Sequence, residues 1–232
     1  SLRRSLNPFY DIICIFKLIT LFKKENPTIV SSHSSKAGIV SRIAAWWCKI
    51  PNTFTAHGWS FAEGIPQPNR TIFLWIERLI GIISYKIIAV AELEREYGIR
   101  QRVASPHKIV TIHYGVNKKY SDNKSLEKRE TTSPFVITMV AGFRPQKDHN
   151  TLLKALHELQ KLNWILYLLG DGELETEIKK LVQELGLEQR VKFEGAVSNV
   201  EDYLIKTDLM VLTTNWEGLP ISILEGLSFG LP

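Results

Sequence analysis

The chain repeats one pattern: a short β-rich run, a loop that contains Gly or Ser, and then an amphipathic helix. The stretch "PTIVSSHSSKAGIVSRIAAWW" contains all three in order, and "KIIAVAELERE" runs from a strand into a helix. Helices of this length between strands favour right-handed βαβ units, in which the strands are parallel and helices cover both faces of the sheet. The pattern therefore predicts an α/β fold.

A polar stretch divides this pattern into two blocks. The run "SDNKSLEKRETTS" has no hydrophobic periodicity and is typical of a linker. We expect a Rossmann-like domain at residues 1–117, a linker at 118–133 and a second Rossmann-like domain at 134–232. In such sheets ligands bind beyond the carboxyl ends of the strands. The loops expected to carry function are those at His33, His57, Gly142, Gly170, Gly195 and Glu217.

Charge is unevenly distributed along the chain. Residues 1–130 hold 20 Lys and Arg against 10 Asp and Glu, whereas residues 131–232 hold 9 against 14. A basic half indicates an anionic partner, and nucleic acid, an acidic membrane surface and a phosphorylated substrate all fit. A solvated basic surface without a partner is the alternative.

The most apolar region of the sequence is not predicted to span a membrane. Residues 72–91 contain Glu77, Arg78 and Lys86, which a spanning helix rarely tolerates, so the region is predicted to be a buried helix that runs into a strand. The sequence begins without a signal peptide or an initiator Met, and we expect it to be part of a longer protein. The two cysteines have no metal-like spacing and fit reduced thiols of a cytosolic protein.

The segment "AGFRPQKDHNTLLKAL" predicts an anion site. Arg144 and Lys147 follow a strand, and Asp148 stands where the next helix is capped. Two cations beside free helix N–H groups suit a diphosphate, although a solvated basic loop is the alternative. Further on, Gly170 and Gly172 lack the third glycine of a dinucleotide fingerprint and instead predict a tight turn near a nucleotide base.

Two histidines stand at predicted strand ends in the first block. His57 lies in "TFTAHGWSF", where a purely structural role is the alternative to a functional one. His33 and Lys36 lie where a helix begins and suit contacts to a phosphate or hydroxyl, while a simple N-cap by Ser34 or Ser35 is the alternative.

Near the end of the sequence, "EGLPISILE" places two acids around a helix start. Pro220 fits the first helical positions, Glu217 precedes them, and Glu225 lies among apolar residues where a carboxylate needs partners. Two acids about 10 Å apart can accept hydrogen bonds from hydroxyls at separate ends of one ligand, as in a nucleotide sugar.

Taken together, "MVAGFRPQKDH", "YLLGDGELE", "VKFEGAV" and "EGLPISILE" resemble the donor domain of retaining glycosyltransferases with the GT-B fold, specifically glycosyltransferase family 4. The earlier motifs "SSHSSKAGIVSRIAA", "FTAHGWSF" and "KIIAVAELERE" resemble the acceptor domain of bacterial members that build surface polysaccharides. The resemblance covers most of the chain from about Ser31 onward. It implies two Rossmann-like domains with parallel sheets facing across a cleft, both incomplete here.

The resemblance implies an enzyme that moves a hexose from a UDP- or GDP-sugar to a lipid-linked or saccharide acceptor. The anomeric configuration would be retained, with no metal and no cofactor, at the cytoplasmic face of a bacterial membrane with an anionic surface. Carried over by position, Glu217 would hold the hexose and Glu225 the ribose. Lys147 and the amides of Gly218 and Leu219 would bind the diphosphate.

Five further residues complete the implied site. The turns at Gly172 and Gly195 would meet the base, and His57 would line the reaction centre beneath the sugar. His33 and Lys36 would lie on the acceptor side. The resemblance implies a same-face displacement without a firmly placed enzymatic nucleophile, so no residue is assigned that role.

Two departures from the family pattern favour an alternative function for the chain. An arginine usual in the family five positions before the lysine is Gly142 here, and Arg144 is the candidate replacement. The first strand, its glycine-rich loop and the following helix are expected to be missing before Ser1, and the last elements after Pro232. The alternative function is therefore an inactive or non-catalytic nucleotide-sugar-binding relative. A nucleic-acid binder is disfavoured because no recognised motif supports it.

Overall fold

The computed structural model describes residues 8–117 and 133–232. The chain forms two compact units, one made of residues 1–114 with 217–219 and the other of residues 115–216 with 220–232. The predicted linker at 118–133 lies, except for Ser133, outside the described residues. Within the described ranges, no helix combines the length and apolar character needed to cross a membrane.

The first unit contains a parallel sheet in the order β1-β2-β3-β4, which confirms the predicted βαβ pattern. Its strands are β1 (Val30–His33), β2 (Asn52–Ala56), β3 (Lys86–Ala89) and β4 (Ile109–Thr111). The helices are α1 (Pro8–Glu25), α2 (Ser35–Trp47), α3 (Asn69–Ile83) and α4 (Glu92–Arg100), and the 3-10 turn η1 (Pro106–Lys108) precedes β4.

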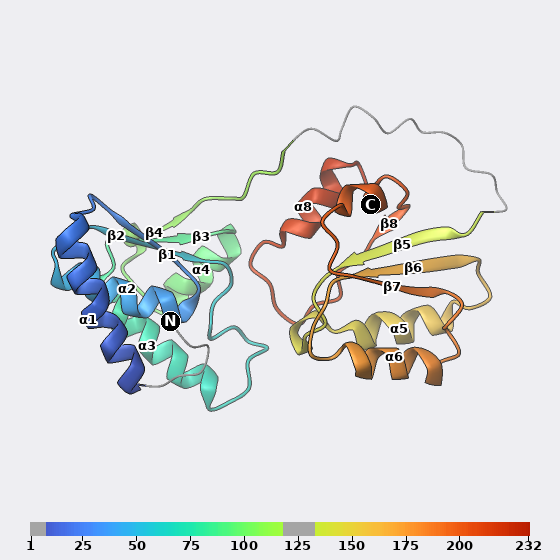
Figure 1. Ribbon diagram of the computed structural model, residues 1–232, viewed down its shortest axis with the longest axis horizontal. Coiled ribbons are helices and arrows are strands. Elements are labelled where there is room, and N and C mark those ends of the chain that lie inside the picture. Colours follow the sequence, from blue (N-terminus) through green and yellow to red (C-terminus); the bar gives the residue numbers. More distant parts are fainter. Residues whose placement is uncertain (1–7, 118–132) are drawn as a thin grey trace. The chain divides into compact units, whose positions relative to one another are not determined.

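The helices of this unit lie on one face of its sheet (Figure 1). The strands follow each other in chain order, and right-handed crossovers then place every connecting helix on the same side. The prediction of helices on both faces is therefore wrong for the described part of this unit. The alternating burial along β1 agrees with helices on one face only, because Val30 and Ser32 are buried while Ser31 and His33 are exposed.

Helix α1 was not among the predicted elements. Pro8 stands at its first position, Asp11 lies in its first turn, and Lys23 and Lys24 lie in its last turn, an arrangement that complements the helix dipole. The helix packs along α2. Its exposed side nevertheless carries Phe9, Ile12 and Phe16, so the sequence lacks a clean polar face.

A buried ion pair lies between α2 and α3. Arg42 and Glu77 are 0% and 1% exposed, and Arg42 Nη2 donates to Glu77 Oε2 at 2.8 Å. The same guanidinium donates to the Gly38 carbonyl and the Ser84 hydroxyl, and it lies 4.1 Å from the centroid of the Phe54 ring. Burial raises the pKa of Glu77 and lowers the pKa of Arg42, and each effect is partly offset by the other charge.

The second unit contains a parallel sheet in the order β7-β6-β5-β8, with α5 and α6 on one face and α8 on the other (Figure 1). Its strands are β5 (Phe135–Val140), β6 (Trp164–Leu169), β7 (Val191–Gly195) and β8 (Leu209–Met210). The helices are α5 (His149–Glu158), α6 (Glu175–Glu184), α7 (Val200–Leu204) and α8 (Ile221–Ser228), with the 3-10 turn η3 at Pro145–Lys147. The predicted elements of this unit are confirmed.

Strand β8 is shorter than its sequence predicts. The apolar run "LMVLTT" favours a strand over residues 209–214, but the ladder ends at Met210. Thr213 Oγ1 donates to the Asp148 carbonyl at 3.0 Å, and Thr214 Oγ1 donates to the Gln146 carbonyl at 3.0 Å. These side-chain bonds draw the chain away from β5 and along the loop that precedes α5.

Candidate active site

The predicted functional loops follow the carboxyl ends of the strands, as expected for parallel α/β sheets. In the first unit His33 is the last residue of β1, and His57 comes directly after β2. In the second unit Gly142 and Gly170 follow β5 and β6, and Gly195 ends β7.

The two histidines of the first unit are in contact. His33 Nδ1 and His57 Nε2 are 2.9 Å apart, and the rings stack with centroids 5.1 Å apart. The other ring nitrogen of His57, Nδ1, forms a hydrogen bond with the hydroxyl of Tyr114. Tyr114 follows β4 in "TIHYG" and was missed by the sequence analysis, although a polar aromatic residue just beyond a strand end was a usable signal.

These contacts favour a neutral His57. Partial burial, and secondly the nearby His33, lower the pKa of His57 below the ordinary histidine value. A neutral imidazole donates from one nitrogen and accepts at the other. Both ring nitrogens of His57 are thus engaged within the cluster, one by His33 and the other by Tyr114.

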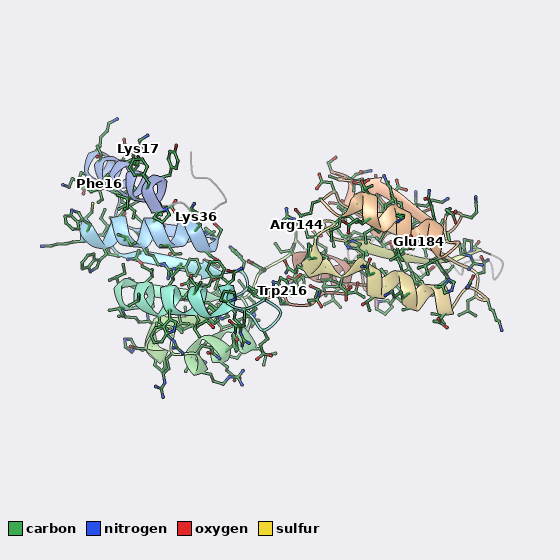
Figure 2. The ribbon with its side chains drawn as sticks, turned by 90° about the horizontal axis from the view of Figure 1, so that it is seen from below. Phe16, Lys17, Lys36, Arg144, Glu184 and Trp216 are labelled. Carbon is green, nitrogen blue, oxygen red and sulfur yellow. The ribbon has the colours of Figure 1, made fainter. Side chains whose placement is uncertain are left out.

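Lys36, predicted as an anion contact, is engaged inside the first unit. Its Nζ lies 2.9 Å from Asp11 Oδ1, with side chains only 14% and 19% exposed. Figure 2 shows Lys36 near the start of α2, on the side of α1. The Asp11 carboxylate therefore compensates much of the charge that an anionic acceptor would meet. Ser34 is the N-cap residue of α2, as the alternative interpretation held, but its side chain makes no cap hydrogen bond.

In the second unit, the loop with Arg144 and Lys147 leads into α5. Asp148 adopts the left-handed conformation, with φ of 41°, and caps α5 by accepting from Thr151 N at 3.3 Å and from Thr151 Oγ1 at 2.7 Å. The predicted cap is confirmed. Burial, which outweighs the adjacent Asp148 carboxylate, lowers the pKa of His149 to about 4. His149 is therefore neutral at pH 7, and the positive charge of this loop comes from Arg144 and Lys147.

This loop is tied to the segment that follows β8. Gln146 Nε2 donates to the Trp216 carbonyl at 2.6 Å, and Asn215 N donates to the Gln146 carbonyl at 2.8 Å. Asn215 Nδ2 also donates to the Pro145 carbonyl at 3.1 Å. The residue before Lys147 and the residue before Glu217 are thus joined directly. Gln146 and Asn215 were missed by the sequence analysis, because nothing local to either segment indicates this pairing.

Arg144 lies close to the space that a side chain at position 142 would occupy. A Cβ atom added to Gly142 would stand 3.8 Å from Arg144 Nε. Arg144 is exposed and extends from the loop of the second unit (Figure 2). The Arg144 side chain therefore passes close to the position at which the resemblance places an arginine.

The loops that follow β5, β6 and β7 line an open cavity of about 260 Å³, and the predicted base-binding residues Gly172 and Gly195 are each adjacent in sequence to a lining residue. The turns approach by their backbones: Ala141 N donates to the Leu169 carbonyl, and Gly170 N donates to the Gly195 carbonyl. Gly170 has φ of +148°, and a Cβ there would lie 2.3 Å from the Ala141 oxygen. The lining residues are Val140, Ala141, Gly142, Leu169, Gly170, Asp171, Ala196, Val197 and Val200.

Substituting Gly170 with alanine is expected to destabilise the second unit by about 3 kcal/mol, because the new methyl group adds steric overlap to backbone strain. Urea denaturation measures this change. Gly186→Ala is the matched control: it has φ of +66° but open space around its Cβ position. It is expected to cost about 1 kcal/mol. Equal losses in the two variants would contradict the close approach at Gly170.

The two acids of the "EGLPISILE" segment fall in different parts of the structure. Glu217, Gly218 and Leu219 group with the first unit, whereas Glu225 lies on α8 in the second. Partial burial, and secondly the Glu201 carboxylate, raise the pKa of Glu225. Within the described residues, no group of three or more His, Cys, Asp or Glu side chains is arranged to hold a metal ion.

Comparison with known proteins identifies relatives over the full length of the chain. The family description "Glycosyltransferase Family 4" matches residues 2–120, and "Glycosyl transferases group 1" matches residues 121–232. The chain is 31% identical to the UDP-Gal:alpha-D-GlcNAc-diphosphoundecaprenol alpha-1,3-galactosyltransferase of Escherichia coli, over 100% of this chain and 63% of the relative. It is 25% identical to the O-antigen biosynthesis glycosyltransferase WbnH of Escherichia coli, over 98% of this chain and again 63% of the relative.

Solved structures show the same fold. The Anabaena protein HepE, in complex with UDP and glucose, matches with a TM-score of 0.78 at 19% identity, over 94% of this chain and 61% of HepE. The lipopolysaccharide outer core galactosyltransferase WaaB matches with a TM-score of 0.68 at 20% identity, over 96% of this chain and 60% of WaaB. The chain therefore has the GT-B fold and spans somewhat less than two thirds of the length of these proteins.

Proposed function

The chain belongs to glycosyltransferase family 4, and from this premise we propose that it moves a hexose from a UDP-sugar to a lipid-diphosphate-linked saccharide in the synthesis of a bacterial surface polysaccharide. The anomeric configuration is retained and no metal ion takes part. Support for this donor and acceptor comes from the Escherichia coli relative at 31% identity, whose name specifies UDP-Gal and a diphosphoundecaprenol-linked sugar. A UDP-sugar is accordingly favoured over a GDP-sugar.

The observation that carries the proposal is the linked pair of loops in the second unit. Gln146 and Asn215 join the loop of Lys147 to the segment that enters Glu217. In the proposal Lys147 binds the diphosphate together with Arg144, with support from the N-terminus of α5. The amides of Gly218 and Leu219 also contact the diphosphate.

The proposal also assigns contacts to the base, the ribose and the hexose of the donor. The uridine base occupies the cavity of about 260 Å³, next to the turns at Gly172 and Gly195. Glu225 accepts hydrogen bonds from the ribose, and Glu217 accepts them from the hexose. These contacts fix the donor in one pose, which lowers the entropic part of the barrier.

The chemical step breaks the bond between the anomeric carbon and the diphosphate. Negative charge grows on the leaving oxygen, and Lys147, Arg144 and amide dipoles stabilise it. Neutral His57 lines the reaction centre, and its bonds to His33 and Tyr114 fix the orientation of its ring there. Lys36 contributes less than the sequence predicts because Asp11 already pairs with it.

The direct test measures thermal shifts with UDP, GDP and their sugars, followed by sugar transfer and donor hydrolysis. A ligand that binds the native state raises the unfolding temperature. Stabilisation by UDP with turnover supports the enzyme. Stabilisation without turnover, in this chain and in a longer version, supports the non-catalytic alternative, which Gly142 favours. No shift with either nucleotide overturns the proposal.

The raised pKa of Glu225 predicts a pH dependence of donor binding. Only the ionised carboxylate accepts hydrogen bonds from both ribose hydroxyls, so UDP affinity is expected to fall as the pH drops through this raised pKa. The fall begins at a higher pH than for an ordinary glutamate. Calorimetric titration across the acidic range measures it. Glu225→Gln is the control, and a pH profile unchanged in this variant would exclude Glu225 as the cause.

A further inference from the structure

A small polar pocket lies between α7 and the neighbouring strands β6 and β7 of the second unit. It has a volume of about 310 Å³, which falls in the lower part of the range for small-ligand sites. This α7 pocket is lined by Tyr167, Glu194, Asn199, Asp202, Tyr203 and Lys206. It shares no lining residue with the cavity proposed for the uridine base, and the contacts proposed for the donor give it no role.

Tyr167 enters the α7 pocket from the sheet. Its neighbours in β6, Leu166 and Leu168, are buried in the core that also contains residues of α5 and α6, and successive residues of a strand point to opposite faces. Tyr167 therefore lies on the face opposite α5 and α6, which Figure 1 shows together on one side of the sheet. Its ring meets that of Tyr203 edge to face, with the centroids 5.7 Å apart.

Glu194 enters the pocket at an irregularity in β7. The ladder with β6 runs in register up to Phe193 and continues at Gly195 with the very next residue of β6, so it skips Glu194. An extra residue of this kind re-aims a side chain, and such bulges are over-represented next to functional sites. The Tyr203 hydroxyl donates to Glu194 Oε2 at 2.7 Å, which fixes the carboxylate and the ring relative to each other.

Helix α7 and its flanking residues supply the opposite wall. Leu204 is buried in the core of the second unit. Asn199, Tyr203 and Lys206 lie about one helical turn apart and line the pocket together with Asp202. Asn199 Nδ2 donates to Asp202 Oδ2 at 2.6 Å. Since a carboxylate offers about four lone-pair positions, these bonds orient the wall and leave acceptor capacity for a ligand.

The lining of the α7 pocket suits a neutral ligand that is rich in hydroxyl groups. A sugar hydroxyl both donates and accepts hydrogen bonds. The two carboxylates accept them, the ammonium of Lys206 donates them, and the amide of Asn199 does both. The tyrosine rings offer apolar surface to the C–H groups of a sugar ring. Two carboxylates beside one lysine disfavour an anionic ligand.

We propose that the α7 pocket is a second carbohydrate site, which holds one sugar unit of a glycan apart from the donor. Glu194, Asp202 and Asn199 bind the hydroxyls of that sugar, and the tyrosines contact its ring. The choice of a glycan rests on the proposed function, in which the chain extends a saccharide. Because the pocket and the cavity proposed for the base have separate linings, the sugar and UDP bind at the same time.

The test is an NMR titration of the isotope-labelled chain with maltose, lactose and N,N′-diacetylchitobiose, each with and without UDP. At least one disaccharide is expected to shift the backbone amides of β7 and α7 under both conditions. Asp202→Ala is expected to weaken this binding about tenfold, because hydrogen bonds to a charged acceptor are lost. The matched control is Glu184→Ala, which removes an exposed acid from α6 in the same unit and leaves binding unchanged. The dispersion of the amide spectra checks the folding of both variants.

Three results would overturn the carbohydrate site. They are no shift with any of the three disaccharides, shifts confined to amides outside β7 and α7, or equal binding by the parent and Asp202→Ala. The thermal shift with UDP is measured on the same samples and is expected to be the same in the parent and Asp202→Ala. Disaccharide binding at α7 without a UDP shift retains the second site and refutes the donor proposal. A UDP shift without disaccharide binding refutes only the second site.

Discussion

Glu77→Ala is expected to destabilise the first unit by about 3–5 kcal/mol, because it leaves the Arg42 guanidinium buried without its counter-charge. Arg42 is fully enclosed, and its remaining acceptors, the Gly38 carbonyl and the Ser84 hydroxyl, are neutral. A loss of this size approaches the whole stability of a typical domain. Urea denaturation of the parent and variant, followed by circular dichroism, measures it.

An exposed ion pair of the second unit provides the control. Lys180 and Glu184 are 3.5 Å apart with side chains 77% and 57% exposed, and Glu184→Ala is expected to cost less than about 1 kcal/mol. A second variant tests the cause directly. If Arg42 and Glu77 are both replaced by apolar residues of similar volume, much of the stability is expected to return. Similar losses for Glu77→Ala and Glu184→Ala would show that the buried pair is unimportant.

Glu217→Ala is expected to lower kcat/KM for sugar transfer about a thousandfold, while the thermal shift with UDP remains. The hexose loses the acid proposed to fix it in the reactive pose, whereas the proposed contacts to the diphosphate and ribose persist. The measurement compares transfer rates and UDP stabilisation in the parent, Glu217→Ala and Glu184→Ala. The last variant removes an exposed acid from α6 (Figure 2) and is expected to retain parental activity.

The result shows whether Glu217 contacts the hexose or takes no part in the reaction. Loss of transfer with UDP binding intact supports a hexose contact, and Glu217→Gln, which still accepts one hydrogen bond, is expected to fall between the parent and Glu217→Ala. Transfer within a few fold of the parent in Glu217→Ala would exclude Glu217 from the reaction.

Most of the fold could be predicted from local patterns, because a buried parallel strand and an amphipathic helix each leave a signature within a few residues. Two elements, α1 and β4, were not predicted, for identifiable reasons. The outer side of α1 carries exposed Phe9 and Phe16, which obscure its helical periodicity. β4 is three residues long, too short to show a pattern. The helices of the first unit share one face because of its strand order, which local sequence does not reveal.

For the candidate site, the structure confirms only that the predicted loops follow the carboxyl ends of strands. That rule located His33, His57 and the glycine turns. Tyr114 was missed with the short strand that precedes it, and Gln146 because its bonds reach residues about seventy positions away. The pairing of Lys36 with Asp11 was missed because it depends on α1. Contacts between elements distant in sequence require the tertiary structure.

The cavity at the ends of β5, β6 and β7 has a consequence for how donor preference can change. Asp171 is the one charged residue among its lining residues, and the others are Gly, Ala, Val and Leu. In the proposed donor pose, with the base in this cavity, discrimination between pyrimidine and purine depends on the path of the main chain more than on exchangeable functional groups. Single substitutions are consequently a poor route to a new nucleotide specificity, and insertions or deletions that redirect these turns are a better starting point for engineering.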